Sequence, residues 1–228
     1  MNSDATQQGL EAAELDPLCS LDDPTRRRLY DFVVAQREPV TRDDASAALD
    51  VDRSTVAYHL DKLVDGGLLA ASFARPEGRG GPGAGRPAKH YERSDREFAV
   101  SVPPRDYQLA AELLARAAEA DATGQVRESL DAAAGELGRE LVGDRQGEPP
   151  RDLVEQLAVQ GFEPYDDDGV IRLRNCPFHR LAQEHTDLVC GMNLALLGAV
   201  AEATGSDRQA RLDPAPDRCC VAFVAEES

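Results

Sequence analysis

A twelve-residue insert, residues 76–87, constrains the fold of this chain more than any other feature. It contains five glycines and three prolines. Glycine has too much backbone freedom and proline lacks an N–H donor, so such a run continues neither a helix nor a strand. The flanking residues 68–74 and 88–93 have the pattern of two short strands. The insert therefore predicts a mobile loop at the tip of a β-hairpin.

Three helices are predicted ahead of this hairpin. Asp23, Thr41 and Asp52 are residue types that cap helix N-termini. Apolar residues recur at helical spacing after each of them, namely Leu29, Phe32 and Val33, then Ala45, Ala48 and Leu49, then Val56, Leu60 and Leu63. Helix, helix, turn, helix and hairpin is the order of a winged helix-turn-helix, which we place at residues 17–100. Residues 1–16 are polar and acidic, and we expect a disordered tail there.

The third predicted helix offers a face for the DNA major groove, because its apolar stripe is turned inward. Its remaining side chains are Arg53, Ser54, Thr55, Ala57, Tyr58, His59 and Lys62, and the hairpin adds Arg79, Arg86 and Lys89 as a basic wing. We expect His59 to pack or to meet a phosphate rather than to read a base. The alternative is a three-helix module used for protein contact.

Net charge at first argues against DNA, since the chain carries −17. The acidity is unevenly distributed, with −4 in residues 1–20, −1 in residues 21–98 and −12 in residues 99–228. Residues 75–93 carry a local charge of +3. The predicted DNA-binding domain is therefore the part of the chain that an anionic partner can approach.

Two segments carry a family resemblance. VDRSTVAYHLDKLVDGGLL at residues 51–69 and GRPAKHY at residues 85–91 resemble the recognition helix and wing of ArsR-like winged-helix regulators. The resemblance covers residues 17–100. It implies that the partner is a double-stranded DNA operator.

Residues 104–142 predict a helical connector with two helices, 107–120 and 125–142. Val126, Leu130, Leu137 and Leu141 form one apolar stripe on the second helix. This stripe packs either within the chain or against a second copy, which would make the segment a dimerisation element of a homodimer. Residues 143–150 have the composition of a linker.

Residues 151–228 predict a small α+β domain, so the whole chain is assigned to the α+β class. The expected elements are a helix at 151–160, a hairpin around 166–169, helices beginning near Phe178 and Asp187, and a last strand from Cys219 to Val224.

Four of the five cysteines lie in this domain, and Cys19 lies near the N-terminus. Cys176, Cys190 and Cys219 are the candidate metal ligands, with His179, His185 and Cys220 as further candidates. Cys190 shares a helix face with apolar residues, so a buried structural role is its alternative. Cys219 and Cys220 are neighbours in the predicted strand, so we expect their side chains on opposite faces and favour Cys219.

This cysteine pattern after a winged helix resembles the iron–sulfur-sensing repressors of the suf operon, over residues 150–228. The resemblance implies an iron–sulfur cluster whose presence alters DNA binding. A fourth ligand would come from His179, His185, another chain or a small thiol. Zn²⁺ and the absence of any cofactor remain alternatives.

We therefore expect a cytoplasmic transcriptional repressor that senses iron–sulfur cluster, metal or redox state. No phosphate-binding loop, nucleophile elbow or Cys-x-x-Cys motif indicates an enzyme. No stretch approaches the roughly 18 consecutive apolar residues of a membrane span. The alternatives are a regulator with an organic-effector domain and structural cysteines, and a thiol-dependent enzyme with an accessory winged helix.

Overall fold

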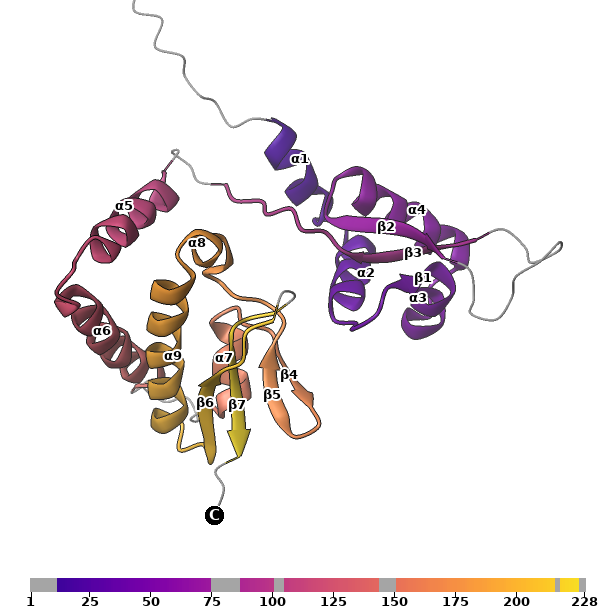
Figure 1. The fold of residues 1–228 in the computed structure, drawn as a ribbon. Coiled ribbons are helices and arrows are strands. Elements are labelled where there is room, and N and C mark those ends of the chain that lie inside the picture. Colours follow the sequence, from indigo (N-terminus) through magenta and orange to yellow (C-terminus); the bar gives the residue numbers. More distant parts are fainter. Residues whose placement is uncertain (1–11, 75–86, 101–104, 144–150, 216–217, 226–228) are drawn as a thin grey trace, which may run out of the picture. The chain divides into compact units, whose positions relative to one another are not determined.

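The structure is a computed structural model that describes residues 12–74, 87–100, 105–143, 151–215 and 218–225. The chain divides into an N-terminal unit, residues 1–105, and a C-terminal unit, residues 106–228. Both units combine helices with a small sheet, which confirms the predicted α+β class (Figure 1). The predicted mobile loop and its Arg79 and Arg86 lie outside the described residues.

The N-terminal unit follows the predicted order of elements. It contains α1 (Ala12–Ser20), α2 (Pro24–Val34), β1 (Val40–Thr41), α3 (Arg42–Leu49), α4 (Arg53–Asp65), β2 (Leu69–Ala74) and β3 (Ala88–Arg93). The strands form an antiparallel sheet in the order β1-β3-β2. Asp23, Thr41 and Asp52 cap α2, α3 and α4 as predicted, each accepting hydrogen bonds from backbone N–H groups at the start of its helix.

Helix α1 begins at Ala12, so residues 12–16 of the predicted disordered tail are helical, and residues 1–11 lie outside the described residues. Pro17 lies inside α1 and is buried. Its Cα lies 3.8 Å from the position a Cβ on Gly66 would take, so α1 packs where α4 ends. Residues 1–16 lack an apolar period of helical spacing, which is why the sequence pattern did not predict this helix.

The core of the N-terminal unit forms between the three capped helices and the sheet. Leu29 of α2, Ala45 of α3 and Leu60 of α4 are all completely buried, and Tyr91 of β3 closes the core from the sheet. The apolar stripe predicted for α4 is therefore confirmed as its inward face. The opposite face of α4 is left to solvent.

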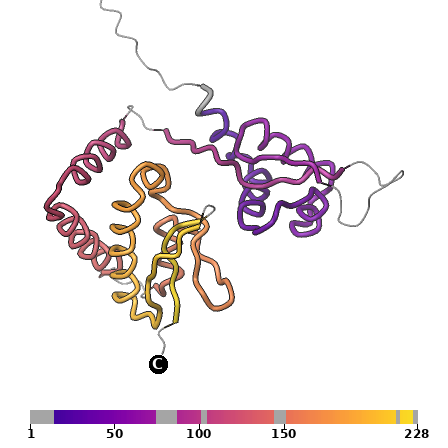
Figure 2. The backbone as a smooth tube through the Cα atoms, viewed as in Figure 1, coloured from indigo at the N-terminus to yellow at the C-terminus, as the bar shows by residue number. Residues whose placement is uncertain are grey.

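The C-terminal unit places its helices around a second sheet (Figures 1 and 2). It contains α5 (Tyr107–Glu119), α6 (Gln125–Val142), α7 (Leu153–Val159), β4 (Pro164–Asp167), β5 (Val170–Leu173), α8 (His179–Glu184), α9 (Thr186–Ala203), β6 (Arg208–Leu212) and β7 (Val221–Ala225). The sheet is antiparallel in the order β4-β5-β7-β6. The sequence pattern missed β6, and it began the last strand two residues early, at Cys219 instead of Val221.

Helix α9 is the centre of the C-terminal unit. Its length and apolar composition would suit a membrane span, and within the described residues it alone meets that test. Many of its apolar side chains are buried, among them Leu197 and Val200, which lie in the core with Phe223 of β7. We therefore read α9 as the core helix of this unit.

Helix α6 packs along α9, so the predicted connector belongs to the same compact unit as the residues that follow it. The contact is made by small residues, because a Cβ on Gly138 would lie only 2.4 Å from the backbone oxygen of Leu196. Of the predicted stripe, Leu130 packs inside the unit, whereas Val126 and Leu137 are exposed. The packing of α6 within the chain thus uses Ala134 and Gly138, and the homodimer contact stays a prediction.

Candidate nucleic-acid interface and cysteine cluster

The exposed face of α4 carries most of the predicted DNA-binding side chains. Arg53, Ser54, Thr55, Tyr58 and Lys62 are all exposed, and Tyr58 is 57% exposed. Guanidinium, hydroxyl, phenol and ammonium groups on one helix face can donate to phosphates and to base edges. This face can therefore enter a major groove without any rearrangement of the core beneath it.

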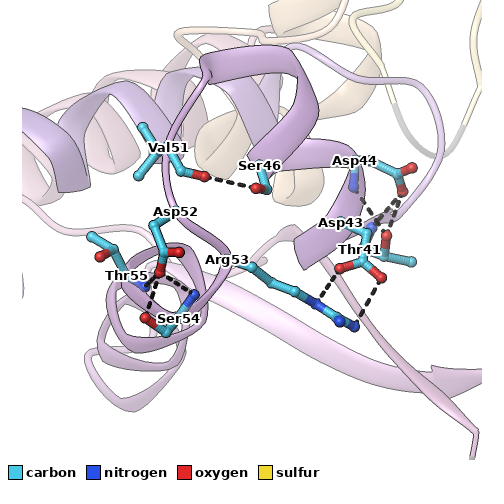
Figure 3. A network of polar contacts seen from close by, with 9 residues as sticks. All are labelled: Thr41, Asp43, Asp44, Ser46, Val51, Asp52, Arg53, Ser54 and Thr55. Atoms are coloured by element: carbon cyan, nitrogen blue, oxygen red, sulfur yellow. Dashed lines mark hydrogen bonds and ion pairs between the residues drawn. The ribbon is translucent and has the colours of Figure 1, made fainter.

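Arg53 is held by a carboxylate that the sequence analysis did not single out. Its guanidinium forms an ion pair with Asp43 at the start of α3, with Nη2 3.0 Å from Oδ2 and Nε facing Oδ1 (Figure 3). Both side chains are more than half exposed. An exposed pair of this kind contributes only about 0–1 kcal/mol, so a phosphate or a base edge can replace Asp43.

The turn between α3 and α4 is tied by short hydrogen bonds (Figure 3). The Ser46 hydroxyl donates to the backbone oxygen of Val51 at 2.6 Å. Asp52 accepts from the backbone N–H of Ser54 at 2.8 Å and from the Ser54 hydroxyl. The Ser54 hydroxyl and the backbone N–H groups of Ser54 and Thr55 lower the pKa of Asp52. The N-terminus of α4 is therefore held in place relative to α3.

His59 lies differently from the other candidates on α4. It is half-buried, and its Nδ1 is buried without a hydrogen-bond partner among the described residues. Its ring packs edge-on against Tyr58 with 5.2 Å between the ring centroids. Ala57 is also half-buried. His59 and Ala57 therefore lie at the edge of the exposed face of α4.

Lys89 belongs to the base of the hairpin and is paired with Asp61 of α4. Its Nζ lies 2.6 Å from Asp61 Oδ1, and the Tyr91 hydroxyl donates to the same oxygen at 3.0 Å. Burial and the Asp61 carboxylate raise the pKa of Tyr91 to about 12, so the phenol stays protonated as a donor. This network fixes the hairpin to α4. Asp61 was missed because its partners lie about thirty residues away.

The structure gathers four thiols in the C-terminal unit, and we call them the cysteine cluster: Cys176, Cys190, Cys219 and Cys220. The Cys176 and Cys219 thiols are in contact, and the Cys220 thiol contacts those of both Cys219 and Cys190. The Asn193 amide donates to Cys219 Sγ at 3.3 Å. Cys219 and Cys220 precede β7, so the prediction that both lie in the last strand is wrong.

The thiols of this cluster are not equivalent. The Cys176 and Cys220 thiols donate to Cys219, and this lowers the pKa of Cys219. The same contacts, together with burial, raise the pKa of Cys176 and of Cys220. Cys219 thus accepts hydrogen bonds from two neighbouring thiols, and thiolate is the form of cysteine that binds metals.

The two candidate imidazoles have partners other than the thiols. His179 Nε2 lies 3.1 Å from the amide nitrogen of Gln183. His185 has Nε2 3.0 Å from Glu112 Oε2 and Nδ1 2.9 Å from Glu119 Oε2. Glu119 and then Glu112 raise the pKa of His185. Of the further candidate ligands, Cys220 is therefore the one that contacts the other thiols.

The comparison with protein families concerns the N-terminal unit. A family model described as a helix-turn-helix domain matches residues 21–70, which contain α2, α3 and α4. No curated protein and no solved structure matches the chain. With the exposed polar face of α4, this match makes the N-terminal unit a helix-turn-helix domain that binds double-stranded DNA, the module of a transcriptional regulator.

Proposed function

We propose that this chain is a sequence-specific, cytoplasmic transcriptional repressor of the ArsR-like winged-helix type that binds a palindromic operator as a homodimer. The observation that carries the DNA-binding part is the exposed polar face of α4 on a helix-turn-helix core. Dimerisation is proposed because helix-turn-helix proteins place two recognition helices about one DNA turn apart.

The C-terminal unit is proposed to sense iron–sulfur status through the cysteine cluster. Four cysteines are the usual ligand set of a [2Fe–2S] or [4Fe–4S] cluster. The donor set is compatible with this group, because Cys219 contacts Cys176 and Cys220, and Cys220 contacts Cys190. Cys219 is buried and the other three thiols are partly buried. When bound, an iron–sulfur cluster would supply a centre whose oxidation state and integrity report on iron and oxidants.

The ligands come from three parts of the fold. Cys176 follows β5, Cys190 belongs to α9, and Cys219 and Cys220 precede β7. Binding or loss of a cluster would move these thiols together or apart and would thereby shift α9 relative to the sheet. Helix α6 packs on α9 and would move with it. We propose that this repacking is the signal passed toward the dimer contact.

The sensor proposal is tested by anaerobic purification of the full chain, followed by visible absorption and by analysis for iron, sulfide and zinc. A coloured protein with iron and acid-labile sulfide supports it. A colourless protein that binds stoichiometric zinc supports a Cys₄ zinc site instead. A metal-free protein that also takes up no iron and sulfide on reconstitution overturns the sensor proposal.

The DNA-binding proposal is tested on an operator selected from random sequence. Arg53→Ala and Tyr58→Ala should each lower specific affinity by ~1–3 kcal/mol, a typical value for a base contact, without changing the circular dichroism of the chain. Arg139→Ala, which removes an exposed arginine from α6, should bind nearly as the parent does. Unchanged affinity in both α4 variants at matched salt would contradict the assignment of α4.

A further inference from the structure

A second group of chemically active side chains lies in the C-terminal unit, outside the cysteine cluster. Glu112 and Glu119 belong to α5, and Glu184 and His185 lie where α8 ends and α9 begins. Glu112, Glu184 and His185 each offer one ligand atom, and these three atoms lie within 4.8 Å of one another. His185 is only 5% exposed, so a buried imidazole faces this carboxylate group.

The imidazole is flanked by a carboxylate at each nitrogen. Nε2 lies 3.0 Å from Glu112 Oε2, and Nδ1 lies 2.9 Å from Glu119 Oε2. Nδ1 is fully buried, and the Glu119 oxygen lies at ion-pair distance from it. A neutral imidazole has one N–H and can satisfy only one of the two carboxylates. The arrangement therefore favours a cation at the ring, either a second proton or a metal ion.

The charges around His185 favour the metal ion. Glu112, Glu119 and Glu184 carry three negative charges, and Arg116, whose Nε lies 2.5 Å from Glu112 Oε1, supplies one positive charge. A second proton on His185 leaves this group at −1. A divalent cation beside a neutral imidazole brings the group to zero.

We propose that Glu112, Glu184 and His185 bind a divalent metal ion of the Mn²⁺ class, with Glu119 orienting the imidazole through its second nitrogen. Two carboxylates and one imidazole suit Mn²⁺, whereas the soft thiolates of the cysteine cluster select iron–sulfur clusters or zinc. A carboxylate on the second nitrogen of a metal-binding histidine is the usual arrangement around such ligands. The bound ion would clamp α5 to the start of α9.

The test measures Mn²⁺ binding to the metal-free full chain by calorimetry and by electron paramagnetic resonance. Glu184→Gln should weaken Mn²⁺ binding at least about tenfold, because loss of even an outer-shell partner costs ~10–100-fold in metal affinity. Glu184 is exposed, so this variant keeps its fold. Glu202→Gln, an exposed glutamate at the far end of α9, is the matched control and should bind as the parent does.

Two further measurements separate this site from the cysteine cluster. Mn²⁺ should raise the unfolding temperature of the parent, since it binds only the folded state, and the rise should be much smaller in Glu184→Gln. A variant with all four cluster cysteines changed to serine should keep its Mn²⁺ affinity if it folds. No Mn²⁺ binding by the parent, or equal affinity in Glu184→Gln and Glu202→Gln, would overturn the proposal and leave a protonated His185 as the cation.

Discussion

At the scale of single residues, carboxylates pair with two of the cations predicted to bind DNA. Arg53 is paired with Asp43, and Lys89 is paired with Asp61. All four side chains are at least about one third exposed. Exposed pairs contribute little to stability and are screened by salt, so phosphates can displace the carboxylates. In a chain of net charge −17, these pairs reduce the attraction to DNA outside the correct site.

Asp43→Asn should therefore raise operator affinity. The substitution frees Arg53 and removes a negative charge beside the DNA face, and we expect a gain of about twofold to fivefold, equivalent to no more than ~1 kcal/mol. Fluorescence anisotropy with a labelled operator at two salt concentrations measures it. Asp31→Asn, an exposed aspartate on α2, makes the same charge change away from Arg53. A gain no larger than that of Asp31→Asn would show that the pair does not restrain Arg53.

At the scale of elements, three aspartates hold the helix N-termini of the N-terminal unit. The Arg26 N–H lowers the pKa of Asp23, the Thr41 N–H lowers the pKa of Asp44, and the Ser54 hydroxyl lowers the pKa of Asp52. A carboxyl whose pKa is lower in the folded state stabilises the fold above its unfolded pKa, near 3.9 for aspartate. That stabilisation is lost as the pH falls through the folded pKa.

The cap at Asp52 tests this pH dependence. Asparagine caps a helix about as well as aspartate but does not titrate, so Asp52→Asn should unfold much like the parent at pH 7. Below about pH 4 it should lose less stability than the parent does. Urea unfolding followed by circular dichroism across this range measures the difference. A variant that loses as much stability as the parent on acidification would remove Asp52 from the acid-sensitive groups.

The contact between α6 and α9 gives a second prediction for elements. Gly138→Ala places a Cβ 2.4 Å from the Leu196 oxygen and 2.9 Å from the Ala199 Cβ, so the helices must separate. We expect a loss of ~1–3 kcal/mol, typical of overpacking. Gly135→Ala on the same helix meets only the Arg139 guanidinium at 3.7 Å, and should gain up to about 1 kcal/mol from helix propensity. Denaturant unfolding of both variants measures the two changes in stability. Equal stabilities would contradict the close packing of α6 on α9.

At the scale of the whole molecule, the proposed function requires that the cysteine cluster influences DNA binding. Cys176→Ser and Cys220→Ser should each abolish cofactor binding and make operator affinity insensitive to reconstitution, without abolishing DNA binding. The sequence alone favoured Cys219 over Cys220, but Cys220 contacts both Cys219 and Cys190, so we expect both cysteines to matter. Cys19→Ser, an exposed cysteine on α1, should behave as the parent does.

Operator affinity of each protein, with and without reconstitution, measures this coupling. The parent and Cys19→Ser should differ between the two states, whereas the cluster variants should not. If the parent binds DNA equally well in both states, the cluster does not regulate DNA binding. In that case the thiols would have a structural role only.

The sequence by itself determined the local elements and the class of the N-terminal unit. Caps such as Asp52 act over two or three residues, and the spacing of Val56, Leu60 and Leu63 specifies the inner face of α4. Short-range rules of this kind also predicted the hairpin and both long helices of the C-terminal unit. They placed Arg53 and Tyr58 on the outer face before any tertiary contact was known.

Only the tertiary structure decided which groups act together. Asn193 contacts Cys219 across 26 residues, and His185 contacts Glu112 across 73. Such pairs depend on how helices and strands pack, and no local spacing encodes that packing. Pro17 and Gly138 show the same limit of local rules. Pro17 packs near Gly66 and Gly138 packs near Leu196, and neither contact follows from the local sequence. The sequence thus predicted the DNA-binding face, and packing assembled the cysteine cluster and the carboxylates around His185.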